Sequence, residues 1–325
     1  MKIRNLDLTK NPINEEHLQL GLPPIEEPIS HPGDHPLLRN AMWFAVVALT
    51  AITLFLIGRF FLSSSWLDNW QTIGETLSGS VFWSAVAVGL FAQVVDGALG
   101  MAYGVTATTF LLATGASPAA ASASVHIAEI FTTGVSGIAH AKFGNVNKQL
   151  FVRLLVPGIL GGILGAIAVT QIDGAMFKPF ISAYLLLLGI YILSKAFRQF
   201  KLRTKPPKHV GKLALFGGFV DAAGGGGWGP VVTSTLIGSG SDPRTTIGSV
   251  NFAEFFLTLT SAAVFALLME TNAWPIIVGL VFGGLFAAPF AAVLCKKLHA
   301  RTLLILVGIL IVIVSLYNLY RAIVV

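Results

Sequence analysis

Residues 96–129 read DGALGMAYGVTATTFLLATGASPAAASASVHIAE, and residues 221–254 read DAAGGGGWGPVVTSTLIGSGSDPRTTIGSVNFAE. The two stretches align without a gap at a constant separation of 125 positions. The matched pairs include Asp96 and Asp221, Gly100 and Gly225, Gly104 and Gly229, Pro118 and Pro243, and Glu129 and Glu254. A single register held over 34 residues of apolar background indicates an internal duplication. The duplicated part contains nearly all the ionisable groups that lie within apolar sequence.

The composition is that of a membrane protein. Hydrophobic residues make up 54% of the 325 positions and charged residues only 11%, whereas a soluble domain carries about 25% charge. Several apolar runs have the roughly 20 residues needed to cross about 30 Å of hydrocarbon. The net charge of +6 therefore concerns orientation in the bilayer and not nucleic acid. The single cysteine, Cys295, excludes an intramolecular disulfide and a Cys-x-x-Cys metal site.

The chain divides into five regions. The first 40 residues are polar and proline-rich, without a cleavable signal peptide, and are typical of a cytoplasmic tail. We expect a cytoplasmic tail at 1–40, an anchor helix at 41–62, a first transmembrane repeat at 80–197, a basic cytoplasmic linker at 198–211 and a second transmembrane repeat at 212–322. Residues 63–80, which contain two acidic residues and no basic one, are expected to form a loop.

Each repeat contains five apolar segments. They cover 81–96, 103–114, 118–140, 151–171 and 176–195 in the first repeat, and 213–221, 228–239, 243–269, 274–295 and 301–320 in the second. The second segment of each repeat is too short to span a bilayer. Glycine-rich breaks at 97–100 and 224–227 separate it from the first segment. Each such pair is either a re-entrant hairpin or two distorted spans. Both leave each repeat with an odd number of crossings, so the two copies are inverted relative to each other.

The charges of the loops support an inverted arrangement of the two repeats. The loops at 142–153, 195–212 and 296–301 are basic, whereas those at 172–174 and 270–273 contain no cation. Placing the basic loops in the cytoplasm puts the N-terminus inside and the C-terminus outside. We therefore predict an all-α polytopic membrane protein with an inverted-topology repeat, broken or re-entrant helices, and one extra N-terminal transmembrane helix.

Inverted repeats with broken helices are typical of secondary transporters, in which substrate binds near the membrane midplane. Peptide N–H groups at the glycine breaks, followed by a helix start, form a surface that suits a small anion. The alternative is that these glycines only permit close helix packing, and that the aromatic residues beside them only fill space. The predicted substrate-binding residues are Gly97, Gly100, Tyr103, Gly104, Gly225, Gly226, Trp228, Gly229 and Asn251.

Four carboxylic acids lie within apolar segments. Asp96 and Asp221 end the first segment of each repeat, where they either hold the turn by accepting hydrogen bonds or bind a proton. Glu129 and Glu254 lie near the middle of long helices, where an acidic side chain costs at least about 2.5 kcal/mol. His126 precedes Glu129 by one helical turn.

Asn251 stands before Glu254 at the position equivalent to His126. We predict that His126, Glu129 and Glu254 couple transport to protons, the alternative being a polar cluster that locks the helices together. Ser117 followed by Pro118 predicts a helix start. The sequence has no phosphate-binding loop, no His/Asp/Glu spacing typical of metal ligands and no Ser/His/Asp arrangement, so we expect neither an enzyme nor a cofactor.

The motifs VVDGALGMAYG, GASP and ASASVHIAEI, repeated as FVDAAGGGGWGP and GSDPRTTIGSVNFAEF, resemble the sulfite exporter TauE/SafE family of membrane permeases. The resemblance covers roughly residues 80–322. It implies transport of small sulfur-containing anions, such as sulfite or organosulfonates, across the bacterial inner membrane. The N-terminal tail with its helix, and the four-glycine run at 224–227, depart from the family pattern.

We therefore expect a secondary transporter for a small sulfur-containing anion, coupled to protons and embedded among membrane lipids. A passive channel for anions or weak acids is the alternative. No nucleic acid partner is expected, and a homo-oligomeric assembly stays open.

Overall fold

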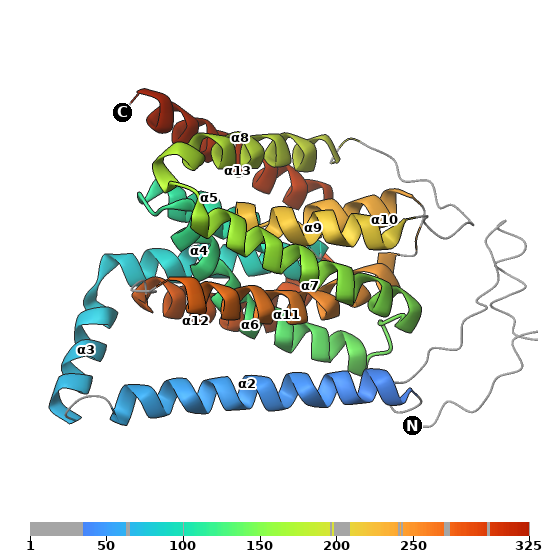
Figure 1. Ribbon diagram of the computed structural model, residues 1–325, viewed down its shortest axis with the longest axis horizontal. Helices are drawn as coiled ribbons and strands as arrows, with labels where there is room; N and C mark the ends of the chain where they lie inside the picture. Colours follow the sequence, from blue (N-terminus) through green and yellow to red (C-terminus); the bar gives the residue numbers. More distant parts are fainter. Residues whose placement is uncertain are drawn as a thin grey trace, which may run out of the picture.

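The computed structural model describes residues 35–62, 66–99, 101–195, 197, 209–239, 241, 243–269, 274–297 and 300–324. These residues form helices and short connections, without a strand among them, which confirms the all-α prediction (Figure 1). Two helices precede the duplicated part, α2 (Pro36–Leu62) and α3 (Trp66–Ser78). The predicted tail at 1–40 and linker at 198–211 lie almost wholly outside the described residues.

The elements of the two halves follow the same order. The first half contains α4 (Ser80–Leu99), α5 (Tyr103–Ala113), α6 (Pro118–Lys142), α7 (Lys148–Gln171) and α8 (Gly174–Lys195). The second contains α9 (Val210–Gly224), the π-helical turn η2 (Gly229–Thr233) continued by α10 (Ser234–Gly238), α11 (Pro243–Leu268), α12 (Trp274–Lys297) and α13 (Ala300–Val324). The Ser117 side chain accepts a hydrogen bond from Ala120 N–H at the start of α6, as the sequence predicts.

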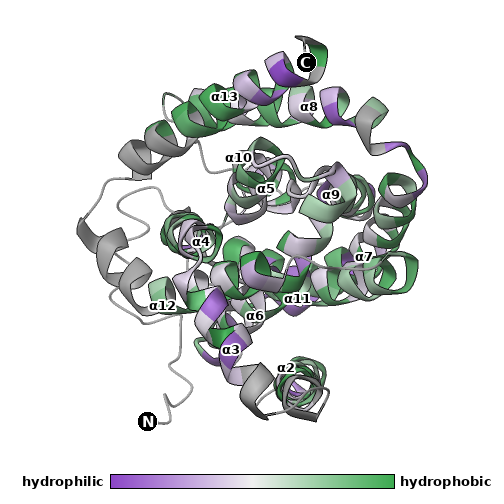
Figure 2. Cartoon of the chain, turned by 90° about the vertical axis from the view of Figure 1, so that its left-hand side faces the viewer, coloured by the Kyte–Doolittle hydropathy of each residue, from purple (hydrophilic) through white to green (hydrophobic). Residues whose placement is uncertain are grey.

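The halves are interleaved and do not form separate bodies. Helix α4 packs along α12, and its counterpart α9 packs along α7, the counterpart of α12. Helix α6 packs against its own counterpart α11, and α8 against α13. Viewed along the helices, the α8–α13 pair lies on one side of the central group and α2 on the opposite side (Figure 2). Every major helix contact within the duplicated part therefore joins one half to the other.

Glycines permit the closest of these contacts. A methyl group added at Gly161 of α7 would overlap the carbonyl oxygen of Leu215 in α9, and one added at Gly283 of α12 would overlap that of Val86 in α4. Small residues at crossings let helix backbones approach closely in membranes, where burial of apolar surface cannot drive association.

Four described helices are long and apolar enough to cross a membrane, and five if the bent pair α3–α4 counts as one span. The four lie within α2, α7, α8 and α11. Helix α2 contains the predicted anchor segment but starts five residues earlier, at Pro36. The inverted orientation of the halves and the anchoring role of α2 stay predictions.

The structure corrects the predicted loop at 63–80, because most of that segment forms α3. Leu67, Trp70, Ile73 and Leu77 recur every three to four positions, a spacing that gives a helix one apolar side. The two acidic residues obscured this period. A bend of 68° separates α3 from α4, and the indole N–H of Trp83 donates to the Leu77 carbonyl at 2.7 Å.

The first break also lies later than predicted. Helix α4 continues through Gly97 to Leu99. An isolated glycine destabilises a helix by only about 1 kcal/mol relative to alanine, and the following Ala98 and Leu99 both favour the helical conformation. Ala102 follows with a left-handed φ of 89° just before α5. The second break matches its prediction, since Gly225 and Gly226 take φ values of 68° and 146° that favour glycine.

Candidate functional site

The carboxylate of Asp221 organises the second break. Its Oδ1 accepts a hydrogen bond from the peptide N–H of Trp228 at 2.9 Å, which joins the end of α9 to the start of the next helical segment. The Asp96 carboxylate accepts the equivalent bond from Tyr103 N–H in the first half. Both carboxylates are buried. The turn-holding alternative for the two aspartates therefore has a direct contact in each half.

His126 connects α6 of the first half to α9 of the second. Its Nε2 lies 3.2 Å from Asp221 Oδ2, and its Nδ1 lies 2.8 Å from the carbonyl oxygen of Ser122. A carbonyl oxygen can only accept, so Nδ1 carries a hydrogen. The Ser122 hydroxyl donates to the Ala222 carbonyl at 2.6 Å and adds a second link between the same helices. The imidazole is fully buried.

Glu129 follows His126 by one turn of α6 and is 2% exposed. Its Oε1 lies beside Gly104, where an added methyl group would come within 2.9 Å of it. Its Oε2 is buried and has no hydrogen-bond partner among the described residues. One donor atom each from His126, Glu129 and Asp221 lie within 4.8 Å of one another. The structure thus brings together three side chains that the sequence separates by up to 95 positions.

Glu254 extends this cluster from α11. Its carboxyl group is partly buried and interacts electrostatically with those of Glu129, Asp96 and Asp221. Four carboxyl groups, two from each half, therefore influence one another in the centre of the protein. Ionised carboxyl groups that repel one another in a poorly solvated site are costly, so a proton or a cation bound among them would stabilise the cluster. Asn251, the counterpart of His126, is buried one turn before Glu254.

The two broken regions touch each other. A methyl group added at Gly104 would lie 2.9 Å from the Cα of Gly226, and the Thr108 hydroxyl donates to the Gly225 carbonyl. The Tyr184 hydroxyl of α8 donates to the Gly226 carbonyl at 3.1 Å. Sequence reasoning missed Tyr184 as a site residue. The matched pair Thr108 and Thr233 was a signal for Thr108, whereas Tyr184 lies outside the aligned stretch.

The remaining predicted binding residues are placed differently. The N–H groups of Gly225 and Gly226 both bond to the Asp221 carbonyl, so in this conformation they are not available to an anion. The Trp228 indole packs in the apolar cluster beside Gly158 and donates to the Val250 carbonyl at 3.1 Å. This placement matches the space-filling alternative for Trp228.

Tyr103 lies closer to the acidic cluster, where it interacts with Glu129 and Asp96 and donates its hydroxyl to the Leu280 carbonyl at 3.2 Å. Gly97 is helical within α4, and Gly229 begins η2. Gly100 lies outside the described residues.

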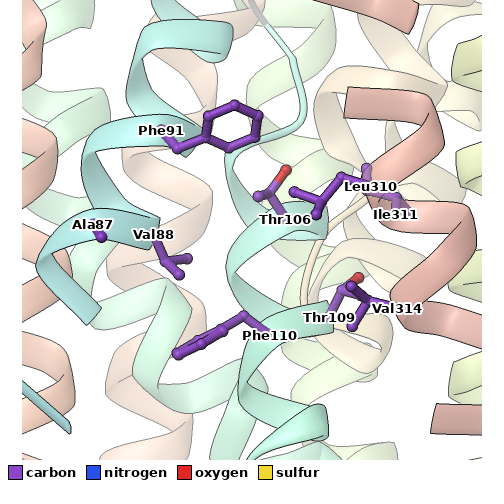
Figure 3. Close-up of a pocket in the computed structure, with 9 residues that line it drawn as sticks. All are labelled: Ala87, Val88, Phe91, Thr106, Thr109, Phe110, Leu310, Ile311 and Val314. Atoms are coloured by element: carbon purple, nitrogen blue, oxygen red, sulfur yellow. The ribbon is translucent and has the colours of Figure 1, made fainter. Parts of the chain in front are cut away.

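A cavity of about 240 Å³ lies on another side of α5, between α4 and α13 (Figure 3). Its lining is apolar except for the two hydroxyl groups drawn in the figure, those of Thr106 and Thr109. An anion would lose its hydration there without gaining donors to replace it. The cavity is therefore not a candidate for binding a small anion.

The family of the chain follows from comparison with known proteins. The family described as "Sulfite exporter TauE/SafE" matches residues 85–318. The chain belongs to the TauE/SafE family. The match starts in α4 and ends in α13, so it spans both halves of the duplication and leaves out α2 and α3. As a TauE/SafE member with several apolar helices, the protein is a multi-pass membrane transporter.

A curated relative supports the same conclusion. The chain is 45% identical over 238 residues to the "Probable membrane transporter protein YtnM" of Bacillus subtilis (strain 168). The alignment covers 70% of this chain and 79% of the relative. No solved structure matches the chain.

Proposed function

We propose that this TauE/SafE protein is a secondary transporter that moves a small sulfur-containing anion, such as sulfite or an organosulfonate, across the bacterial inner membrane with proton coupling. Membership of the family supports the substrate class. The observation that carries the coupling is the His126–Asp221 contact, which joins the two halves at a helix break. The predicted region boundaries, with N-terminus inside and C-terminus outside, belong to this proposal.

The pairing of helices supports an alternating-access carrier. Because α4 packs on α12 and α9 on α7, each contact has a counterpart in which the two halves exchange roles. Such an arrangement is what an inverted repeat needs for its halves to exchange conformations around a central site. Gly104 lies against the Gly225–Gly226 turn, so the two broken regions are in contact in this conformation, as a closed state of a carrier requires. The anion binds where these segments separate.

The proton would act at one defined place. Because Nδ1 of His126 already carries a hydrogen, a second hydrogen between Nε2 and Asp221 Oδ2 completes a bond across the halves. Removing that hydrogen leaves a ring lone pair facing a carboxylate oxygen at 3.2 Å, two acceptors that repel. Protonation thus favours the closed contact, and deprotonation favours separation of α6 from α9. Glu129 and Glu254 accept or supply the proton from either side.

Flux into proteoliposomes containing the purified protein tests this function. We expect sulfite or a sulfonate to move faster than into empty liposomes, with a rate that depends on an imposed pH gradient. Unlabelled substrate on the far side should accelerate entry of labelled substrate, because only a carrier shows counterflow. Entry that is unaffected by substrate on the far side would support the channel, and absence of flux for every sulfur anion would contradict the substrate class.

A further inference from the structure

The three converging side chains have the construction of a metal site. Two of them, His126 and Asp221, are each held at one end by a hydrogen bond, and one donor atom from each of the three lies within 4.8 Å of the others. His126 is fixed through Nδ1 by the Ser122 carbonyl at 2.8 Å, and Asp221 through Oδ1 by the Trp228 N–H at 2.9 Å. Metal-binding histidines almost always donate their second ring N–H to a carbonyl or carboxylate, and metal-binding carboxylates are themselves hydrogen-bonded. Their remaining donor atoms, Nε2 and Oδ2, already lie 3.2 Å apart and share a hydrogen bond that a metal would replace.

Glu129 supplies the observation that points to a ligand. Its Oε2 is buried without a hydrogen-bond partner in the described part of the chain, and the side chain is 2% exposed. A buried polar atom normally has a partner, and a buried carboxylate without one is costly. We propose that His126, Glu129 and Asp221 together bind one divalent transition-metal cation. The inference does not depend on the transported substrate.

The donor set and its spacing fit such a cation. Two ligands of a tetrahedral ion at about 2.1 Å lie about 3.4 Å apart, close to the observed His126–Asp221 separation. All three donors lie within 4.8 Å of one another, so reaching the tetrahedral separation of about 3.4 Å needs a shift of at most about 1.4 Å. One imidazole nitrogen with two carboxylate oxygens suits ions such as Zn²⁺, Co²⁺ or Mn²⁺, whereas Ca²⁺ and Mg²⁺ prefer oxygen alone.

Charge balance also favours the cation. Two carboxylates are neutralised by one divalent ion, and the hydrogen between Nε2 and Oδ2 leaves to solvent as the metal binds. Three protein ligands leave one coordination position open. Glu129 and the Gly226 turn both lie beside Gly104, so the three ligands are close to the contact between the two helix breaks. An anion bound there would meet a positive centre in a site otherwise rich in carboxylates, a consequence that does rest on the proposed function.

The duplication provides a matched control. The counterparts of the three ligands are Asn251, Glu254 and Asp96, so the second half lacks the imidazole. We therefore expect one cation per chain. Glu254→Gln removes the equivalent carboxylate without removing a ligand.

Isothermal titration of the purified, chelator-treated full chain in detergent tests the site, with Zn²⁺, Co²⁺ and Ca²⁺ as separate probes. We expect saturable 1:1 binding of Zn²⁺ and Co²⁺, no comparable Ca²⁺ binding, and proton release that shows as a buffer-dependent heat. Glu129→Gln and His126→Gln should each weaken binding by at least about tenfold. Glu254→Gln removes a neighbouring charge but no ligand, so it should weaken binding less than either of these substitutions. X-ray absorption of the Zn²⁺-loaded native protein should show one imidazole among oxygen ligands.

Two results would overturn the site: no saturable binding to the native protein, or equal binding by native protein and a folded Glu129→Gln variant. If the variants fail to fold, X-ray absorption of the Zn²⁺-loaded native protein tests the site instead. Several imidazoles around the metal would show that it binds elsewhere and would contradict the proposed ligands. Binding is measured without transport, so its failure is distinct from a failure of flux.

Discussion

Replacement of His126 by leucine tests whether the His126–Asp221 pair holds the two halves together. Both side chains are buried, 0% and 2% exposed, so solvent does not screen their interaction. The substitution removes the bond to Asp221 and the bond to Ser122, and leaves Asp221 Oδ2 without a donor. Removing one partner of a buried pair costs about 3–5 kcal/mol. For a chain of 325 residues, this corresponds to a fall in melting temperature of about 4–7 °C.

Thermal unfolding in detergent, followed by tryptophan fluorescence, measures this effect. The fully buried Trp228, bonded to the same carboxylate, lies beside the perturbed contact. The double variant His126→Leu/Asp221→Asn should recover more than half of the loss, because the unpaired buried charge is gone while the amide oxygen still accepts from Trp228 N–H. A fall of less than about 2 °C for His126→Leu, or a double variant no more stable than the single one, would refute the pairing.

Three further predictions concern the same region. Gly104→Ala places a methyl group 2.9 Å from Gly226 Cα and should destabilise the protein by about 1–3 kcal/mol in thermal unfolding, whereas Gly58→Ala, with open space around it, should not. Glu129→Gln should remove the dependence of flux on a pH gradient while leaving the melting temperature within about 3 °C of native, since an amide keeps the shape; flux that still follows the gradient would exclude Glu129 from coupling. His126→Gln places an amide nitrogen near the position of Nε2 and should retain more stability than His126→Leu in thermal unfolding, because it can still donate to Asp221; equal stability of the two would contradict this.

Helix boundaries could be predicted from the sequence where nearby residues determine them. The short α5, the start of α6 after Ser117 and the second break at Gly225 and Gly226 all follow from segment length, capping and glycine content. Helix α3 was missed because its acidic residues suggested a loop, although its apolar residues recur at helical spacing. Gly97 shows the converse error, since a single glycine between good helix formers does not end a helix.

The sequence names candidate site residues but cannot show which contacts they make. Helical spacing places His126 and Glu129 on one side of α6, yet it cannot show that Asp221 is their partner, because that depends on how α6 packs against α9. The same limit applies to Trp228. Its position beside a glycine run suggested a wall of the binding site, whereas the direction of its indole is decided by packing against Gly158 in α7.

The duplication makes the scaffold nearly symmetric, but the chemistry on it is not. Both halves have an aspartate that holds a helix break and a glutamate on the facing helix, which is what exchange of conformations between equivalent halves requires. Only the first half has an imidazole, at His126, where the second has Asn251. An amide cannot gain or lose a proton near neutral pH or replace imidazole as a metal ligand. Symmetric motion with one chemically distinct side would let a single proton or cation favour one of two otherwise equivalent conformations, while the gradients of substrate and protons set the direction of net transport.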